Sequence, residues 1–377
     1  MTTFPIIKST SDLLEIIELY HRRTTVAERA ANPPFFQSWD IDSFYPSILH
    51  AELLPAISSL LDTAWAVLDP LGNKCLRVAF STSGKRGTAL PLVDATAAPL
   101  PRSLNVNKTV IMDMLRVLLK HSYVRFGAKL MLQKNGLPMG TQSGPDLANW
   151  FGYSYELTYL RALVAAISAG AEPGASDARR SCAALTLYAR FIDDVLNFNN
   201  LQFQQILNVY PPSISFTAAT PLTTGNIGIP YMDARIFQSS SAPHQVSIRL
   251  YDKRRDDKYT AIDIIQYTHW QSFLPHTTKL NIFTSQFHRF TRLLTNERSF
   301  QLEVAICLCK LIMLKLVPRT PLLRKLRKLL FQGTTQYIHG APAVHRAGWH
   351  HQRILHYLDI GERRSLPALL RLAAMPE

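Results

Sequence analysis

The chain has 377 residues and a formal net charge of +14 at pH 7. A hydrophobic fraction of 47% is that of a globular protein and excludes a wholly disordered chain. The excess of 41 Lys and Arg over 27 Asp and Glu favours a polyanionic partner, because basic side chains bind the phosphates of a nucleic acid independently of its base sequence. Every apolar run long enough to span a membrane is interrupted by charged residues, and the amino terminus lacks the pattern of a secretory signal peptide. We expect an intracellular protein that is neither secreted nor membrane-bound. A nuclear location is left open.

The elements predicted from hydrophobic periodicity describe an α+β chain. In order they are a helix at 11–21, a strand at 35–41, a helix at 46–68, an irregular stretch at 71–109, a helix at 110–121, a strand at 126–133, a helix at 145–167, a low-complexity connection at 168–181, and strands at 185–192 and 195–198. The last two strands flank an Asp pair as a hairpin.

The composition changes after residue 250, where we place a domain boundary. Residues 310–358 contain no Asp or Glu, but nine Lys or Arg and five His. Within this stretch one helical face is leucine-rich and the other is basic. The leucines are Leu322, Leu323, Leu326, Leu329 and Leu330, and the basic residues are Arg324, Lys325, Arg327 and Lys328. A solvated helix face is the ordinary outcome for such charges, but the absence of acid favours nucleic-acid binding.

Cysteines and histidines give no metal pattern. The four cysteines, Cys75, Cys182, Cys307 and Cys309, have no zinc spacing and are expected to be buried, reduced thiols. The histidines His345, His350 and His351 also fit no metal spacing, so we expect them at the surface or facing phosphates.

Three separated segments carry the predicted chemistry. Asp40 ends the strand at 35–41, and Asp193 and Asp194 form a pair at a hairpin tip. Carboxylates from distant strands that converge can hold two Mg²⁺ or Mn²⁺ ions, which stabilise the attacking and leaving oxygens of nucleotidyl transfer. An Asp pair in a turn, taken alone, is more often simple turn chemistry. Asp42 receives no assignment.

Two further features lie between these carboxylates. Tyr45 follows Asp40 by five residues, and its ring could exclude a 2′-hydroxyl from the incoming sugar. A half-buried tyrosine that packs a helix onto a sheet is the plain alternative. The Gly/Pro loop at 136–149 opens a helix and suits close approach of the backbone to a nucleotide or template. An ordinary loop-to-helix junction is the alternative for that loop.

Together these segments resemble the reverse transcriptases, most closely those of Penelope-like retroelements, whose palm is akin to that of telomerase. Trp39–Ile48 is similar to the first catalytic motif, Gly136–Asn149 to the Gly-x-Pro-Met-Gly motif, and Arg190–Val195 to the Arg-Tyr-Ile-Asp-Asp motif with Phe191 in place of Tyr. The likeness continues through 212–217, 231–236, 250–253 and 269–292. It spans roughly residues 36–300.

The resemblance implies a right-hand polymerase palm, an antiparallel sheet packed with helices. The implied domains are an amino-terminal helical segment at 1–34 (reduced fingers), a palm at 35–250 with a fingers-like insertion at 71–133, and a mainly helical basic thumb at 251–377. Asp40, Asp193 and Asp194 would be catalytic and bind the metals. Ile41, Tyr45, Met139 and Gly140 would bind the nucleotide, while Lys253, Arg324, Lys325, Arg327 and Lys328 would bind nucleic acid.

Two departures from the family concern the fingers and the carboxy end. Only 39 residues precede Asp40, so we expect Lys74, Arg77, Lys85 and Arg86 to meet the triphosphate. No Gly-Ile-Tyr…Tyr-Ile-Gly nuclease signature occurs.

The expected function is an RNA-directed DNA polymerase of retroelement origin that uses deoxynucleoside triphosphates, an RNA template and a DNA primer. The alternatives are a catalytically inactive nucleic-acid-binding protein on the same palm, and a template-independent or RNA polymerase. The sequence leaves oligomeric state and priming open.

Overall fold

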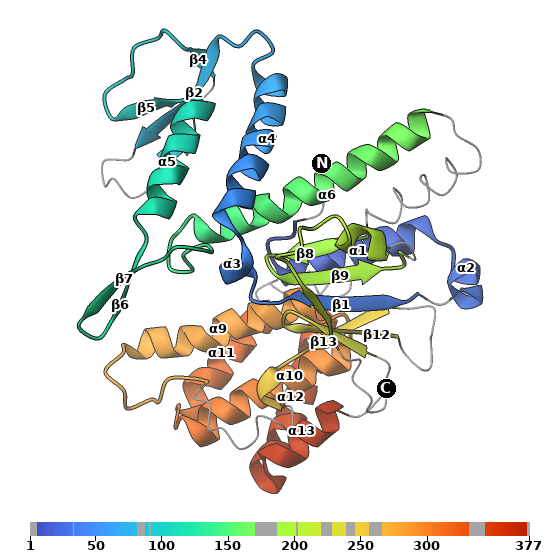
Figure 1. Ribbon diagram of the computed structural model, residues 1–377. Helices are drawn as coiled ribbons and strands as arrows, with labels where there is room; N and C mark the ends of the chain where they lie inside the picture. Colours follow the sequence, from blue (N-terminus) through green and yellow to red (C-terminus); the bar gives the residue numbers. More distant parts are fainter. Residues whose placement is uncertain are drawn as a thin grey trace. The chain divides into compact units, whose positions relative to one another are not determined.

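The computed structural model describes residues 6–32, 34–80, 87–89, 92–169, 187–200, 203–219, 228–238, 246–255, 266–331 and 344–374. These residues combine helices with antiparallel sheets, which confirms the predicted mixed class (Figure 1). The chain divides into two compact units, the first formed by residues 1–6, 39–195 and 200–217, and the second by 7–38, 196–199 and 218–377. The functional boundaries of palm, fingers and thumb stay predictions.

A four-stranded sheet contains the segments predicted to be catalytic. Its strand order is β10 (Phe216–Ala218), β1 (Phe36–Ile41), β9 (Asp194–Phe198) and β8 (Ala189–Phe191). The N–H of Ile41 donates to the carbonyl of Asp193 over 3.0 Å, and the N–H of Asp42 donates to that of Ser215 over 3.0 Å. These bonds place the end of β1 between the β8–β9 turn and the start of β10.

Helices α4 (His50–Leu68), α5 (Lys108–Lys120) and α6 (Gly144–Ser168) surround the core of the first unit. Each buries apolar residues three or four positions apart, as amphipathic helices do. The buried residues include Leu53, Ile57 and Leu61 of α4, Met112, Leu115 and Leu119 of α5, and Leu147, Phe151 and Leu163 of α6. Among the described helices only α4 has the length and composition to cross a membrane, and its buried leucines belong to this core.

The predicted helix at 46–68 is broken in the structure. Its first turn is the separate helix α3 (Phe44–Ser47), and α4 begins at His50. Ile48 between them is extended, and its N–H still donates to the carbonyl of Phe44 over 3.2 Å.

The expectation of an irregular stretch at 71–109 is wrong. The structure places strands β2 (Lys74–Phe80), β3 (Gly87–Ala89), β4 (Val93–Asp94) and β5 (Ser103–Val106) there. Three of these strands have two to four residues, the seven-residue strand β2 buries Arg77 and exposes Phe80, and the paired residues lie up to thirty positions apart, so no local periodicity marks them. Arg77 is buried and donates to Asn105 Oδ1 over 2.9 Å and to the Ala98 carbonyl over 2.7 Å, so the structure does not offer it to a triphosphate. Lys74 is exposed, whereas Lys85 and Arg86 lie outside the described residues.

The predicted single strand at 126–133 is a hairpin. Strands β6 (Tyr123–Phe126) and β7 (Lys129–Leu132) pair through a two-residue turn, in which Gly127 has φ +59°. Every residue of both strands is exposed. The predicted connection at 168–181 lies outside the described residues from residue 170 onwards.

The second unit combines a three-stranded sheet with helices. The sheet has the order β11 (Gly228–Tyr231), β12 (Ala234–Gln238) and β13 (Val246–Leu250), all antiparallel. The helices are α1 (Thr10–Arg23), α2 (Val26–Ala31), α9 (His276–Leu293), α10 (Glu297–Cys309), α11 (Arg319–Phe331), α12 (Val344–Arg364) and α13 (Leu366–Ala374). Helix α10 is buried from Phe300 to Cys309, which confirms the prediction for Cys307 and Cys309.

Two expectations for this unit have different outcomes. Leu322, Leu326 and Leu330 of α11 are buried, as the leucine face predicts. The surface placement of His350 is wrong, because its ring is buried, lies edge-on to Phe300 and has Nδ1 3.0 Å from Gln301 Nε2. A histidine with a polar partner and an aromatic neighbour is stable in a core, and sequence spacing gives no sign of either.

Candidate active site at the end of strand β1

The site begins where β1 ends. Alternation along the strand buries Ile41, which is 1% exposed, and leaves Asp40 exposed. Asp42 lies beside β10, where its carboxylate accepts from Ser215 Oγ over 3.0 Å and from Thr217 Oγ1 over 2.8 Å. Asp42 therefore ties two strands together, and Asp40 is the carboxylate that the strand presents to solvent.

The predicted Asp pair occupies the turn between β8 and β9. Ile192 has φ +57°, a left-handed conformation that a β-branched side chain rarely adopts. Asp193 and Asp194 are both partly buried, and Asp194 begins β9. The bond from Ile41 to Asp193 makes the backbones of the two predicted motifs neighbours.

Tyr45 lies close to this turn. Burial raises the pKa of its phenol, and the nearby negative charges of Asp193 and Asp146 raise it further. Its ring edge would lie 3.4 Å from a Cβ built on Gly144, at the start of α6. The structure therefore brings Tyr45 together with Asp193 and with the start of the helix.

The Gly/Pro loop packs against the chain at Tyr45 and Pro46. Gly136 has φ +78°, and a Cβ there would lie 2.7 Å from Pro46 Cα and 2.8 Å from the Tyr45 carbonyl oxygen. The N–H of Leu137 donates to that same carbonyl over 2.8 Å. Met139 is 67% exposed, and a Cβ on Gly140 would meet no described atom within 4 Å. The loop is thus fixed at one end and open at Met139 and Gly140, the two positions expected to meet a nucleotide.

A buried polar network lies behind the turn, and the sequence analysis did not assign it. Glu156 of α6 accepts from Arg190 of β8 and from the hydroxyls of Tyr188 (2.6 Å) and Tyr210 (2.7 Å). Burial and the charge of Glu156 raise the pKa of both tyrosines well above 10. The available signal was a glutamate within an apolar helix, since such a residue needs partners when it is buried.

The carboxylates near the end of β1 are candidate ligands for the predicted metal. Within the described ranges, no three His, Cys, Asp or Glu side chains gather closely enough to hold an ion by themselves. Mg²⁺, however, binds through one or two carboxylates and completes its shell with water and substrate phosphates. Asp40 at the end of β1 and Asp193 in the neighbouring turn carry hard oxygen donors of the type that such a site uses.

The residues predicted to bind nucleic acid belong to the second unit. Lys253 is exposed in the short helix η1 (Lys253–Arg255). On α11, Arg324, Arg327 and Lys328 are exposed, whereas Lys325 donates to Asn281 Oδ1 over 2.7 Å. The structure places the basic residues of α11 around the side of the helix opposite its buried leucines.

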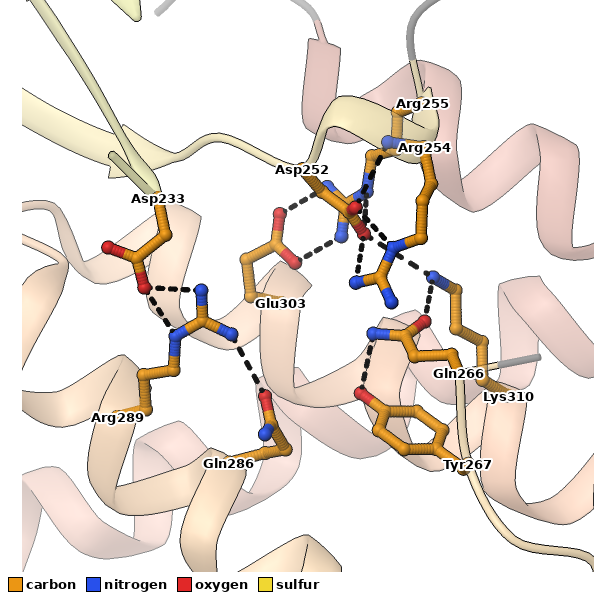
Figure 2. Close-up of polar contacts among 10 residues, drawn as sticks. All are labelled: Asp233, Asp252, Arg254, Arg255, Gln266, Tyr267, Gln286, Arg289, Glu303 and Lys310. Atoms are coloured by element: carbon orange, nitrogen blue, oxygen red, sulfur yellow. Dashed lines mark hydrogen bonds and ion pairs between the residues drawn. The ribbon is translucent and has the colours of Figure 1, made fainter. Parts of the chain in front are cut away.

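A cavity of about 220 Å³ in the second unit is lined by an ionic network (Figure 2). Glu303 accepts two bonds of 2.6 Å from Arg255, Asp252 accepts from Arg254 over 2.6 and 3.0 Å, and Asp233 pairs with Arg289. Lys310 donates to Gln266 Oε1 over 2.8 Å, and burial and the charge of Arg255 lower its pKa. Arg255 and Glu303 thus join η1 to α10, and Asp233 and Arg289 join the β11–β12 turn to α9, on the walls of this cavity.

Comparisons with known proteins give a likeness of fold. No family model matches the sequence, and no curated protein matches it. The structure is similar to telomerase from Candida albicans in complex with the TWJ fragment of telomeric RNA, with a TM-score of 0.53 and 12% identity, over 98% of this chain and 54% of that one. Apo telomerase from Candida tropicalis gives a TM-score of 0.43 and 9% identity, over 97% of this chain and 57% of that one. The chain spans about half the length of these telomerases, and its mixed fold with antiparallel sheets is similar to that of the Candida albicans enzyme.

Proposed function

We propose that the protein is an RNA-directed DNA polymerase of the reverse-transcriptase kind, derived from a retroelement of the Penelope-like type. The observation that carries this proposal is the 3.0 Å bond between Ile41 and the Asp193 carbonyl, which joins the strand end bearing Asp40 to the turn bearing the Asp pair. The likeness of fold to a telomerase agrees with it.

Asp40, Asp193 and Asp194 would hold two Mg²⁺ ions, or Mn²⁺ in their place. Bound metal ions would supply charge that stabilises the attacking and leaving oxygens of nucleotidyl transfer. The chain's own residues would select and orient the nucleotide. Ile41, Met139 and Gly140 would contact it, and the half-buried ring of Tyr45 would exclude a 2′-hydroxyl.

The partners in this proposal are an RNA template and a DNA primer. The matched Candida albicans structure contains telomeric RNA, a polyanion of the same chemistry. In this chain the exposed cations Lys253, Arg324, Arg327 and Lys328, with Lys325 beside them, would bind the phosphate backbone.

Primer extension on an RNA template with Mg²⁺ and deoxynucleotides tests the proposal. Asp193→Asn should abolish extension while leaving the fold and template–primer binding intact. Asp42→Asn is the matched control, because it removes a carboxylate two residues from Asp40 yet keeps an oxygen that accepts from one of the Ser215 and Thr217 hydroxyls and an amide N–H that can donate to the other. Undiminished synthesis by Asp193→Asn would refute the site, and binding without synthesis by the wild-type chain would favour a non-catalytic binding protein.

A further inference from the structure

Arg190, three residues before Asp193, is a fully buried arginine with a defined partner for each nitrogen. Its Nε and Nη2 donate to the two Glu156 oxygens over 2.6 and 3.1 Å. Nη1 donates to Asn149 Oδ1 over 3.0 Å, and Nη2 to the Asn149 carbonyl over 3.0 Å. Nη1 also donates to the carbonyl of Ile192 over 3.1 Å. The guanidinium therefore joins helix α6 to the turn that carries the Asp pair.

The charge of Arg190 is balanced within the same network. Burial alone would lower its pKa, but the charge of Glu156 keeps that pKa raised, so the guanidinium stays ionised. Glu156 is itself buried and also accepts from Tyr188 and Tyr210, which leaves its oxygens well satisfied. A buried ion pair gives little net stability compared with apolar residues of similar volume. A role in positioning the neighbouring backbone explains the buried Arg190–Glu156 pair better than a contribution to stability does.

The atom that Arg190 holds is the carbonyl of Ile192. Ile192 has φ +57°, and a β-branched residue keeps that conformation only where its surroundings impose it. The same peptide unit continues into Asp193, whose own carbonyl accepts from Ile41. The turn is thus fixed on one side by Arg190 and on the other by β1.

Gly152 of α6 makes room for this arrangement. A Cβ at that position would lie 2.8 Å from Arg190 Cζ, 2.9 Å from Nη2 and 3.1 Å from Nη1. These distances are shorter than normal contacts, so any side chain at position 152 would displace the guanidinium. Helix α6 therefore approaches the arginine through a glycine.

We propose that Arg190 is a positioning residue for the reaction: it holds the left-handed turn at Ile192 and so sets the place of the Asp193 carboxylate. Asn149 and Glu156 anchor the Arg190 guanidinium to α6, the helix that begins at the loop proposed to face the nucleotide. This inference rests on the proposed polymerase function and adds a residue that touches neither nucleotide nor metal. Lysine could not replace Arg190, because one ammonium cannot reach all three partners in the planar geometry of a guanidinium.

The test uses the full chain with Gly152→Ala and Arg190→Lys, which keep every other partner in place. Ser154→Ala is the control on the same helix, since among the described residues its hydroxyl bonds only to the Phe151 carbonyl of its own helix. Two quantities are measured: kcat and KM for single-nucleotide addition, and hydrogen–deuterium exchange of peptides covering 189–195. Because small displacements of reacting groups are costly, kcat should fall roughly 10- to 100-fold in both variants, with KM within about threefold.

Exchange should rise in the peptides of the turn and stay at wild-type rates in α4 and α5. An unchanged kcat in folded Gly152→Ala and Arg190→Lys would overturn the inference. So would faster exchange throughout the first unit, because Arg190 would then act only on general stability. If the wild-type chain synthesises no DNA, the proposed function fails, whereas the exchange measurement still decides whether Arg190 holds the turn.

Discussion

The N–H of Ile41 donates to the carbonyl of Asp193 over 3.0 Å, although 152 positions separate the two residues in the chain. This bond aligns the end of β1 with the turn between β8 and β9. Asp40, at the end of β1, and Asp193, in the turn, are consequently on neighbouring segments of the sheet, and the proposed metal-dependent nucleotidyl transfer depends on this arrangement.

Tyr45→Ala should raise the incorporation of ribonucleotides relative to deoxynucleotides. The ring of Tyr45 lies near Asp193 and Gly144, where it would meet the sugar of a bound nucleotide. Removing the ring should increase the ribose/deoxyribose ratio of kcat/KM by roughly tenfold or more, equivalent to about 1.4 kcal/mol of lost discrimination. Tyr45→Phe keeps the ring and should keep the wild-type ratio. An unchanged ratio in Tyr45→Ala would refute the role of Tyr45 as a sugar filter.

Gly136→Ala should destabilise the first unit. The new Cβ would combine a left-handed φ with a distance of 2.7 Å to Pro46 Cα, which is backbone and cannot swing away. We expect a loss of about 2–4 kcal/mol in the free energy of unfolding, measured by urea titration. Gly127→Ala is the matched control, with φ +59° but no described atom within 4 Å of the new Cβ, and should cost only about 1 kcal/mol. Equal losses would show that the contact with Pro46 has no effect.

Asp252 should make the free energy of unfolding of the second unit fall at acid pH. Burial alone would raise its pKa, but the hydrogen bond from Arg254 and the charges of Arg255, Arg254 and Lys310 lower it overall. The folded pKa therefore lies below the unfolded one, so the stabilisation is complete above the unfolded value and is lost as the pH falls through the folded value.

Asp252→Asn should flatten the fall in the free energy of unfolding that the wild type shows as the pH drops from about 4, the unfolded value, through the lower folded pKa of Asp252. Arg254→Gln should flatten it in the same direction, because it removes the hydrogen bond that lowers the pKa. The measurement is urea unfolding at a series of pH values. A curve for Asp252→Asn parallel to that of the wild type would contradict this account of the network.

The basic face of α11 should give nucleic-acid binding its salt dependence. Replacing Arg324, Arg327 and Lys328 together by Gln should weaken binding at low salt without affecting the buried leucines. If each contacts one phosphate, the slope of log K against log salt should fall by about 1 per residue. Binding to an RNA–DNA duplex, measured by fluorescence anisotropy at several salt concentrations, checks this. A slope equal to that of the wild type would place the phosphate contacts elsewhere.

The long helices and the strand β1 could be predicted from the sequence because their periodicity is local. Residues 145–167 became α6 within one residue at each end, and the strand at 35–41 began at Phe36. The strands β4 and β5 could not be predicted, because each is short and is stabilised by pairing with a distant partner. The longer strand β2 was missed because it buries Arg77 and exposes Phe80, so its polarity does not alternate as burial does. The β6–β7 hairpin was missed because its turn has only two residues, Gly127 and Ala128. So short a turn does not separate the flanking residues into two recognisable strands.

The candidate site divides in the same way. Asp40, Tyr45 and the Asp pair stand in short motifs, so their residue types and spacing made them candidates, and the structure places Asp193 beside the end of β1 and near Tyr45. The network of Glu156, Arg190 and Tyr210 has no short motif, since its members come together only when α6 covers the sheet. The φ of Ile192 also follows from that three-dimensional arrangement, because isoleucine has no local preference for it.

One measurement tests the central claim most directly: addition of single nucleotides to a DNA primer on an RNA template, with each of the four deoxynucleotides offered alone, by the wild type, Asp40→Asn, Asp193→Asn and Asp42→Asn. We predict addition of only the nucleotide complementary to the template by the wild type and by Asp42→Asn, and none by Asp40→Asn or Asp193→Asn. Addition without regard to the template, or addition that survives the loss of Asp40 and of Asp193, would contradict the account.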